Sequence, residues 1–431
     1  MKNKNGPHKN LNLNVRGLGK SATIAISEKA NSLMEHGVKV FKLGLGQSPF
    51  PVPEPVVEEL RNNAHQKDYL QTQGLLALRK AIAHHHNQMY GLKSTAADVL
   101  IGPGSKELMF LLQLCYYGDL VIPTPAWVSY EPQAKIIGRP VNFMPTTFED
   151  GWKIHSDHIR EICHSDCTRP RIIVLNYPNN PSGTTYSNDE LHAIAREAKR
   201  YEVILLSDEI YGQIHFQGKH ISIATYYPEG TIISTGLSKW CGAGGWRLGC
   251  FVFPHSLKWL LDSMTAVASE TYTSTSTPIQ FAAVRAFQGG YTIEQYLAHV
   301  RRILSALGKK AAQMLRQAGA RVAEPEGAFY LFPNFSPLNE KLARHNIYNS
   351  RDLCEYSLNE MSIAFLPGSE FGRPADELTA RIAYVDFNGA RALSASEHIP
   401  LAETLGDDFL DHFCRPALTG IERLCDWLTG L

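Results

Sequence analysis

The sequence lacks several features that would assign it to common classes of protein. No apolar run approaches the roughly 18 residues that a membrane-spanning helix requires, so we expect no membrane partner. The formal net charge is +0, with 42 basic and 42 acidic residues, and no overall field favours nucleic acid. Residues 1–20 carry basic but no acidic side chains and lack the apolar core of a secretory signal. We interpret them as a solvated, mobile arm.

Paired cysteines are also missing. The eight cysteines are scattered and include no Cys-x-x-Cys pair, so the sequence predicts neither a disulfide framework nor a metal site. Cys163 and Cys167 lie near three histidines, but a solvated helix end is the better interpretation of that segment. Several cysteines lie in apolar runs, as free thiols do in a reducing compartment, and we therefore expect a cytoplasmic protein. The consecutive histidines 84–86 would point to different sides of a helix, and we interpret them as surface residues.

Length and composition indicate a large globular chain. With 431 residues, of which 44% are hydrophobic and 19% charged, it can form roughly two or three domains. Short apolar runs alternate with helical patterns between residues 99 and 253, which predicts an α/β fold with a doubly wound, mostly parallel sheet. Long helical patterns dominate after residue 290. We predict a large domain over 49–290 and a smaller α+β domain over 291–431, to which the N-terminal segment 1–48 is joined.

The pattern also predicts individual elements. The expected helices are 21–40, 53–66, 74–90, 107–116 and 187–201. The expected strands are 99–101, 120–122, 171–175, 203–207, 231–234 and 248–253, with 321–322, 330–332 and 380–384 in the smaller domain. Polar residues follow the carboxyl ends of the large-domain strands, where sheets of this kind bind ligands.

One lysine stands out in the stretch from Ser234 to Gly249. Lys239 follows an apolar run and precedes a glycine-rich turn and Arg247. A lysine amine is normally protonated and a poor nucleophile until burial or nearby cations lower its pKa. The small residues around Lys239 leave room for a flat ring, and a guanidinium such as that of Arg247 suits a phosphate. Taken alone, this stretch also fits a surface lysine in a polar loop.

Further motifs follow other predicted strands. The sequence Gly-Pro-Gly-Ser-Lys at 102–106 opens a helix, where backbone N–H groups form a phosphate seat. Trp127 lies in a proline-rich loop, Asn180 begins an Asn-Pro-Ser-Gly sequence, and Asp208 begins Asp-Glu-Ile-Tyr. Each also has a purely structural interpretation. Trp127 could be a core tryptophan, Asn180 could belong to a turn before a capped helix, and Asp208 could be a charged strand end.

Together these motifs resemble the class I and II aminotransferases, fold-type I enzymes that use pyridoxal 5′-phosphate (PLP). The resemblance covers about residues 40–390. It implies that the large domain binds PLP, that Lys239 carries it as an internal aldimine, and that the substrates are an L-amino acid and a 2-oxo acid. It also implies a homodimer with shared active sites.

The resemblance further implies roles for single residues. Asp208 would face the pyridine nitrogen, Tyr211 and Asn180 would bind the O3′ oxygen, and Trp127 would stack on the ring. Arg381 and Gly46 would hold the substrate α-carboxylate, next to Trp127 and Asn180. The remaining expected cofactor contacts are Gly104, Ser105, Lys106, Ser238, Arg247 and, from the neighbouring subunit, Tyr69.

The sequence departs from the family pattern at two places. Gly236 occupies a position where many members have a serine on the phosphate. The segment 387–411 is longer and more irregular than expected and has no functional interpretation.

Two alternatives share the scaffold. One is a PLP-dependent lyase, acting on C–S bonds or resembling aminocyclopropane-carboxylate synthase. The other is a PLP-sensing transcription regulator, which would need a DNA-binding domain that the residues before Leu43 do not show. The preferred amino donor is open. Candidates for the side-chain pocket are Gln47, Ser48, Lys106 and, from the neighbouring subunit, Tyr272. Lys106 would either receive a distal carboxylate or point into solvent.

Overall fold

Seven strands form the large sheet in the computed structural model, which describes residues 10–431. Their order is β2-β8-β7-β6-β5-β3-β4; β8 runs antiparallel to both neighbours and the other pairs are parallel. Their bounds are β2 Val99–Gly102, β3 Asp119–Thr124, β4 Val141–Pro145, β5 Arg171–Asn176, β6 Ile204–Asp208, β7 Thr231–Gly236 and β8 Gly249–Val252. The predicted doubly wound, mostly parallel α/β sheet is confirmed.

The central strands are buried along their whole length because helices cover both faces of the sheet. Side chains alternate between the faces: Ile172 and Val174 join the core under α4 and α8, whereas Ile173 and Leu175 pack against α6 and α7. The helices around this sheet are α2 (Glu54–Asn63), α3 (Leu76–Tyr90), α4 (Ser105–Cys115), α5 (Tyr130–Ile137), α6 (Ser156–His164), α7 (Asn188–Arg200), α8 (Lys258–Thr271) and α9 (Thr277–Gln288).

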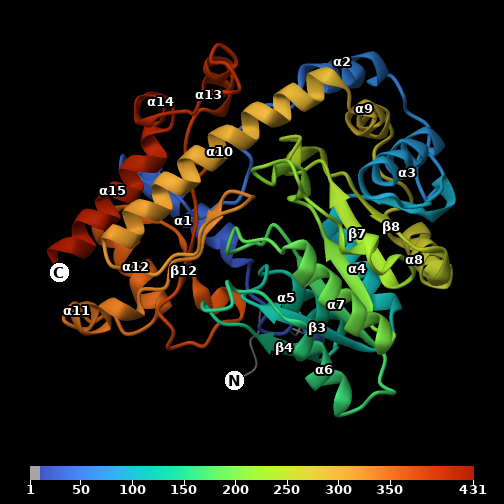
Figure 1. The fold of residues 1–431 in the computed structure, drawn as a ribbon, viewed down its shortest axis with the longest axis horizontal. Helices are drawn as coiled ribbons and strands as arrows, with labels where there is room; N and C mark the ends of the chain where they lie inside the picture. Colours follow the sequence, from blue (N-terminus) through green and yellow to red (C-terminus); the bar gives the residue numbers. More distant parts are fainter. Residues whose placement is uncertain (1–9) are drawn as a thin grey trace, which may run out of the picture.

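The C-terminal part begins with the long helix α10 (Tyr291–Gln317), which runs from the side of α2 and α9 to the side of α12 (Figure 1). Its small antiparallel sheet has the order β11-β12-β9, with bounds Leu366–Pro367, Ala380–Ala383 and Tyr330–Leu331. β1 (Phe41–Lys42) pairs in parallel with β10 (Ile363–Ala364). The other helices here are α1 (Ala22–Glu35), α11 (Asn339–Ala343), α12 (Ser350–Met361), α13 (Gly389–Glu397), α14 (Asp407–Phe413) and α15 (Arg415–Gly430).

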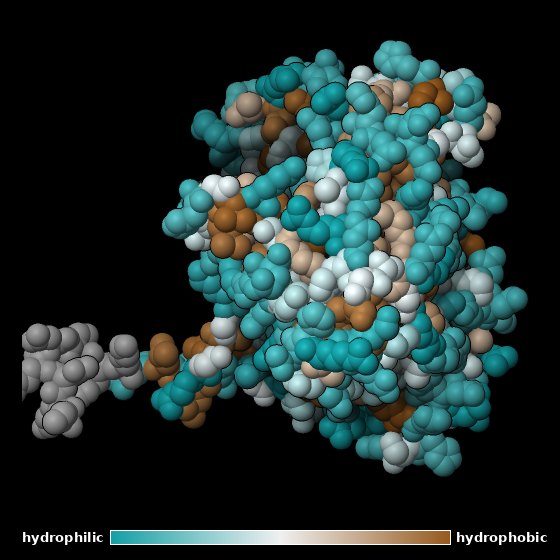
Figure 2. All heavy atoms as spheres, turned by 90° about the vertical axis from the view of Figure 1, so that its left-hand side faces the viewer, coloured by the Kyte–Doolittle hydropathy of each residue, from teal (hydrophilic) through white to brown (hydrophobic). Residues whose placement is uncertain are grey.

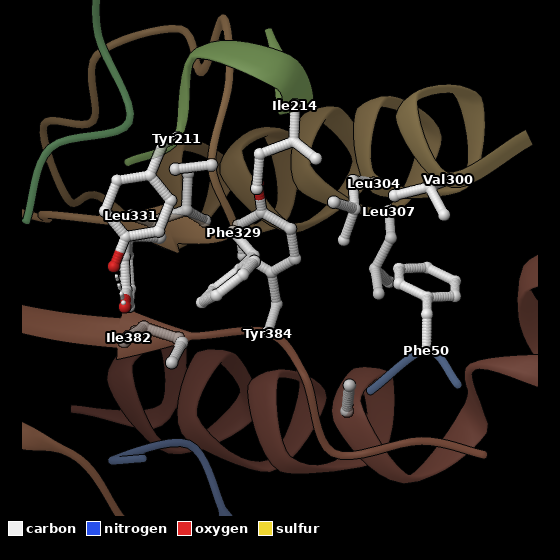
Figure 3. Close-up of a cluster of buried hydrophobic side chains, with 14 of the residues drawn as sticks. Phe50, Tyr211, Ile214, Val300, Leu304, Leu307, Phe329, Leu331, Ile382 and Tyr384 are labelled. Atoms are coloured by element: carbon white, nitrogen blue, oxygen red, sulfur yellow. Dashed lines mark hydrogen bonds between the residues drawn. The ribbon is translucent and has the colours of Figure 1, made fainter. Parts of the chain in front are cut away.

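The β1–β10 pair ties the N-terminal segment to the C-terminal part of the chain. We retain the division into 49–290 and 291–431, with 1–48 joined to the latter, as a proposal. Figure 3 shows how one core spans both parts: Val300, Leu304 and Leu307 of α10 approach Phe50, while Tyr211 lies near Leu331 and Phe329. The two parts therefore share side-chain packing next to the strand ends of the large sheet.

Several expectations from the sequence are wrong in detail. The helix expected over 21–40 ends at Glu35, because Gly37 adopts a left-handed φ of +85° and its N–H closes the turn on Met34. The strand expected over 321–322 is reduced to a single antiparallel β-bridge between Arg321 and Asn334. The segment 387–411 is not irregular throughout, since it contains α13.

The interpretation of histidines 84–86 as surface residues is wrong for His86. That side chain is buried and its Nδ1 lies 2.9 Å from the main-chain oxygen of Ile82. Its face of α3 packs against the large core.

The N-terminal arm is described only in part, since residues 1–9 lie outside the described residues. Figure 2 shows the following segment extending from the body with apolar side chains along it, and Leu11 and Leu13 are largely exposed. A short 3-10 turn at Leu13–Val15 contacts α5. Among the described helices, none is long and apolar enough to cross a membrane.

Candidate active site

A cavity of about 460 Å³ opens at the carboxyl ends of β5 and β6. All the expected catalytic, cofactor and α-carboxylate residues line it, except Gly104 and Tyr69, and of the candidates for the side-chain pocket Ser48 and Tyr272 do not line it. The expected residues that line it come from five separate parts of the chain: the loop after β1, the start of α4, the loop after β3, the segments that follow β5, β6 and β7, and β12. The fold thus brings together side chains that are hundreds of residues apart.

Lys239 reaches into this cavity from the loop after β7. Its amine donates a 2.6 Å hydrogen bond to the main-chain oxygen of Gly46. Burial, followed by the charges of Arg381 and Arg247, lowers the pKa of the amine to about 8 against a smaller opposite effect of Asp208. The amine therefore loses its proton far more readily than an ordinary lysine and is better able to act as a nucleophile or base.

Asp208 ends β6 and is buried at the cavity floor. Burial raises the pKa of its carboxyl to about 6, although the Tyr130 hydroxyl donates to it at 2.6 Å and Ser234 at 3.4 Å. Asn176 fixes the adjacent main chain, because its Nδ2 donates to the oxygen of Asp208 at 2.9 Å. A carboxylate held in this way gains strongly from a cationic partner in the cavity.

Arg381 of β12 lies on the other side of the cavity and is only 2% exposed. It donates to Asn180 Oδ1 at 3.1 Å and to the main-chain oxygen of Gly44 at 2.5 Å, and its Nε has no hydrogen-bond partner among the described residues. The rings of Tyr330 and Phe371 flank its guanidinium at 4.7 and 5.0 Å. A buried guanidinium with an unpaired donor suits an anionic ligand such as a carboxylate.

Tyr211 and Tyr330 link these two sides. Their hydroxyl oxygens are 2.8 Å apart, and both residues line the cavity. Burial raises the pKa of both hydroxyls, so both stay protonated at neutral pH.

The start of α4 and the turn after Lys239 form a second end of the cavity. Gly104 precedes α4 with a φ of +95°, and a Cβ there would lie 2.3 Å from Nη2 of Arg247. Arg247 donates to the main-chain oxygens of Gly244 and Pro103, and Ser105 and Ser238 line the same end. Backbone N–H groups, two hydroxyls and one guanidinium thus surround a space that fits a phosphate.

Packing explains the glycine at 236. A Cβ on Gly236 would lie 2.7 Å from the main-chain oxygen of Leu248, so a serine would displace β8. The position where the sequence departs from the family pattern therefore has no room for a side chain in this chain.

Lys106 and Trp127 lie at the cavity mouth. The Lys106 amine is 5.5 Å from the Trp127 ring, and burial followed by the charge of Arg247 lowers its pKa. Ser21 and Thr23, at the start of α1, line the same cavity, as does Gln47. Of the other two candidates for this pocket, Ser48 is buried outside the cavity lining, and the Tyr272 hydroxyl donates to the main-chain oxygen of Ile101.

Tyr69 is 88% exposed and does not line the cavity of its own protomer. The Thr277 hydroxyl donates to the main-chain oxygen of Asp68 at 2.8 Å, which links the Tyr69 loop to the start of α9.

The sequence motifs did not indicate Tyr330, Tyr130 or the contribution of α1. Tyr130 and Ser234 both donate to Asp208 in the structure. Tyr330 lies in a predicted strand of the smaller sheet, and nothing in the sequence indicates which face of that strand meets the cavity.

Comparisons with known proteins agree with this geometry. The family model for aminotransferase class I and II matches residues 38–387. The chain is 32% identical over 371 residues to the aspartate aminotransferase of Geobacillus stearothermophilus, with 84% of this chain and 91% of the relative covered. It is 30% identical over 380 residues to the aspartate aminotransferase of Bacillus sp. (strain YM-2), with 86% and 93% covered.

The fold comparison gives the same result. The solved structure of Thermus thermophilus aspartate aminotransferase with maleate matches with a TM-score of 0.82 at 25% identity, and the match covers 97% of this chain and 100% of that chain.

Proposed function

Since the chain belongs to the class I and II aminotransferases and is a transaminase that acts on amino acids and 2-oxo acids, we propose that it uses PLP held by Lys239 and takes its amino group from an acidic L-amino acid. One observation carries the proposal: two basic side chains, Arg381 and Lys106, line one cavity together with Lys239. A dicarboxylic amino acid has two carboxylates for these two cations.

The chemistry of the cavity fits PLP. Asp208 supplies a buried anion for a protonated ring nitrogen, and Lys239 supplies an amine for an aldehyde. Ser105, Ser238 and Arg247 supply donors for a phosphate, with Gly104 preceding the helix start. A Cβ on Gly245, which also lines the cavity, would meet no other atom within 4 Å, so the wall there is open to a ligand. A protonated ring nitrogen would thus face the anion Asp208, and the phosphate would face the cation Arg247.

The remaining cofactor contacts follow from the same arrangement. Tyr211 and Asn180 would bind the ring oxygen, since an amide whose Oδ1 accepts from Arg381 also carries two N–H donors. Trp127 would stack on the ring from the cavity mouth. Bound PLP supplies an electron-withdrawing ring that lowers the cost of charge at the substrate α-carbon.

The chain's own residues bind the substrate and move its proton. Arg381 binds the α-carboxylate, with Gly46 beside it, and so fixes the α-carbon near Lys239. The uncharged Nζ of Lys239 accepts the α-proton and later returns it, and a pKa of about 8 suits this role near neutral pH. The rings of Tyr330 and Phe371 exclude water from Arg381 and strengthen its pairing with a carboxylate.

Lys106 would bind the second carboxylate. Its amine lies over the Trp127 ring, and the hydroxyls of Ser21 and Thr23 line the same cavity. Support comes from the aspartate aminotransferases among the relatives, and from the Thermus thermophilus aspartate aminotransferase, which was solved with maleate, a dicarboxylate.

We further propose that the enzyme is a homodimer in which Tyr69 completes the neighbour's phosphate site. The exposure of Tyr69 within one protomer supports this assignment. The scattered cysteines continue to favour a cytoplasmic location, which we keep as a proposal.

Incubation with single amino acids tests the function directly. Purified protein is mixed with PLP and then with aspartate, glutamate, alanine or phenylalanine, without a keto acid. Stoichiometric conversion of bound PLP to pyridoxamine phosphate, fastest with the acidic donors, is the expected result; catalytic release of pyruvate and ammonia would instead identify a lyase.

Borohydride reduction tests the role of Lys239. Reduction should trap PLP on the wild-type chain at the Lys239 peptide and should trap none on Lys239→Ala. PLP that remains reducibly attached to the Lys239→Ala protein would contradict the assignment.

A further inference from the structure

A second buried carboxylate follows Asp208 in the chain but lies outside the cavity. The side chains of Glu209 and His220 are each 3% exposed, and the imidazole Nε2 lies 3.0 Å from Glu209 Oε2. The other carboxylate oxygen accepts from Ser207 at 2.8 Å and from Ser222. Hydrogen bonds from β6 and from the loop after it thus converge on one side chain.

These contacts keep Glu209 ionised. Burial alone would raise the pKa of its carboxyl, but the bonds from His220, Ser222 and Ser207 outweigh burial and lower the pKa. Nδ1 of His220 is buried and has no hydrogen-bond partner among the described residues. The imidazole therefore contacts Glu209 through its Nε2 edge alone, and the cluster holds the negative charge of the Glu209 carboxylate.

The other groups that face Glu209 do not neutralise this charge. Burial lowers the pKa of His86 on α3 and raises that of Tyr90, so both are uncharged at neutral pH. Tyr177, after β5, is likewise held neutral by burial. The charge of Glu209 also acts on Asp208, whose carboxyl has its pKa raised mainly by burial and further by Glu209.

The main chain at Glu209 is also fixed. Its N–H donates to the oxygen of Ser234 at 2.9 Å, and its oxygen accepts from Gly212 at 2.8 Å. Glu209 therefore connects β7 with the turn that carries Tyr211. Asp208 precedes it and Tyr211 follows two residues later, and both face the cavity.

We propose that Glu209, held by His220, Ser207 and Ser222, is a positioning residue that fixes the chain between Asp208 and Tyr211 and places a second negative charge behind Asp208. This inference rests on the proposed use of PLP. A second anion at this place favours the protonated state of a cationic group that Asp208 faces, and so strengthens cofactor binding. The pair does this without touching the substrate.

A comparison of two buried carboxylates tests the proposal. Glu209→Gln removes the charge but keeps the shape, and Glu197→Gln does the same on α7, where Glu197 is 4% exposed and lies near Arg160, Arg196 and Arg200. Three quantities are measured: the dissociation constant of PLP from the apoprotein, the pH midpoint of the absorbance of bound PLP, and the melting temperature of the apoprotein.

We expect Glu209→Gln to weaken PLP binding on the order of tenfold and to move the absorbance midpoint to lower pH. Removal of a nearby negative charge lowers the pKa of a cationic group on the bound cofactor. Glu197→Gln should lower the melting temperature alone. A wild-type dissociation constant and midpoint in Glu209→Gln would overturn the proposal, as would equal shifts in Glu197→Gln.

A second pair of variants covers the case in which Glu209→Gln does not fold. His220→Gln retains an N–H donor for Glu209 and should bind PLP nearly as the wild type does, whereas His220→Phe should weaken binding. Equal dissociation constants for these two variants would overturn the proposal. Failure of the wild-type chain to bind PLP would instead overturn the proposed cofactor itself, so the two failures are distinguishable.

Discussion

Lys239 and Gly46, 193 positions apart in the sequence, are joined by a 2.6 Å hydrogen bond from the lysine amine to the main-chain oxygen. Gly46 lies in the loop after β1, and Lys239 lies in the loop after β7. The Tyr330 hydroxyl occupies the space beside Gly46, since a Cβ on Gly46 would lie 2.0 Å from it. The N-terminal loop, the large sheet and the small sheet therefore meet at the lysine.

Gly46→Ala should impair the site through this contact. The added methyl group collides with the Tyr330 hydroxyl, and relief must move either the loop or the ring that packs on Arg381. Overpacking of this kind costs about 1–3 kcal/mol, so we expect a lower melting temperature and a raised KM for every amino donor. The measurements are thermal unfolding and steady-state kinetics.

Gly406→Ala is the matched control, because a Cβ there meets no atom within 4 Å and Gly406 lies outside the cavity lining. Adding Tyr330→Phe to Gly46→Ala removes the nearest clashing atom and should restore part of the lost stability. A double variant no more stable than Gly46→Ala would show that the collision with the hydroxyl is not the cause.

The pH dependence of PLP capture should report the lowered pKa of Lys239. The amine reacts in its uncharged form, which an ordinary lysine reaches only near pH ~10.4. Because burial and the neighbouring cations lower the Lys239 pKa to about 8, the capture rate should rise with pH through a midpoint near 8. Stopped-flow absorbance after mixing apoprotein with PLP at a series of pH values gives this midpoint.

Arg381→Met should move the same midpoint to higher pH, because a positive charge near the amine is lost. Arg321→Met serves as the control, since Arg321 pairs with Glu149 at the surface. An unchanged midpoint in Arg381→Met would mean that the charge of Arg381 does not influence Lys239.

Lys106→Met should separate acidic from neutral amino donors. A charge-assisted hydrogen bond contributes about 1.5–3 kcal/mol, so kcat/KM for aspartate and glutamate should fall roughly ten- to a hundred-fold. Alanine, methionine and phenylalanine lack a distal carboxylate and should react at nearly unchanged kcat/KM. Equal losses on both groups would assign Lys106 to the cofactor or the fold.

Mixed dimers should reveal shared active sites. Tyr69→Phe and Lys239→Ala each damage a different part of the same site if Tyr69 serves the neighbour. Mixing the two variant chains should therefore produce some sites with both wild-type residues, and activity should exceed that of either variant alone. Activity no higher than in the separate variants, with subunit exchange demonstrated by mass spectrometry, would place Tyr69 outside the neighbour's site.

Local patterns in the sequence were enough to predict the large sheet. The buried strands of an α/β sheet are short apolar runs, and such runs mark β5, β6 and β7 within one or two residues of their observed bounds. The polar residue that ends each strand then indicates the ligand edge, where Asp208 lies. Lys239, Arg247 and Asn180 lie in distinctive local motifs, and the resemblance of these motifs to a known family implied the role of each residue.

Tertiary structure alone decided the contacts between distant segments. Gly46, Tyr330 and Arg381 come from three regions of the chain, and their meeting with Lys239 depends on how the small sheet packs against the large one. The burial of His86 and of the Glu209–His220 pair likewise depends on α3 packing over the end of β6. Periodicity specifies which face of an element is apolar, but tertiary packing decides which groups surround a buried polar side chain. The lowered pKa of Lys239 and the raised pKa of Asp208 both result from such packing, through burial and neighbouring charges.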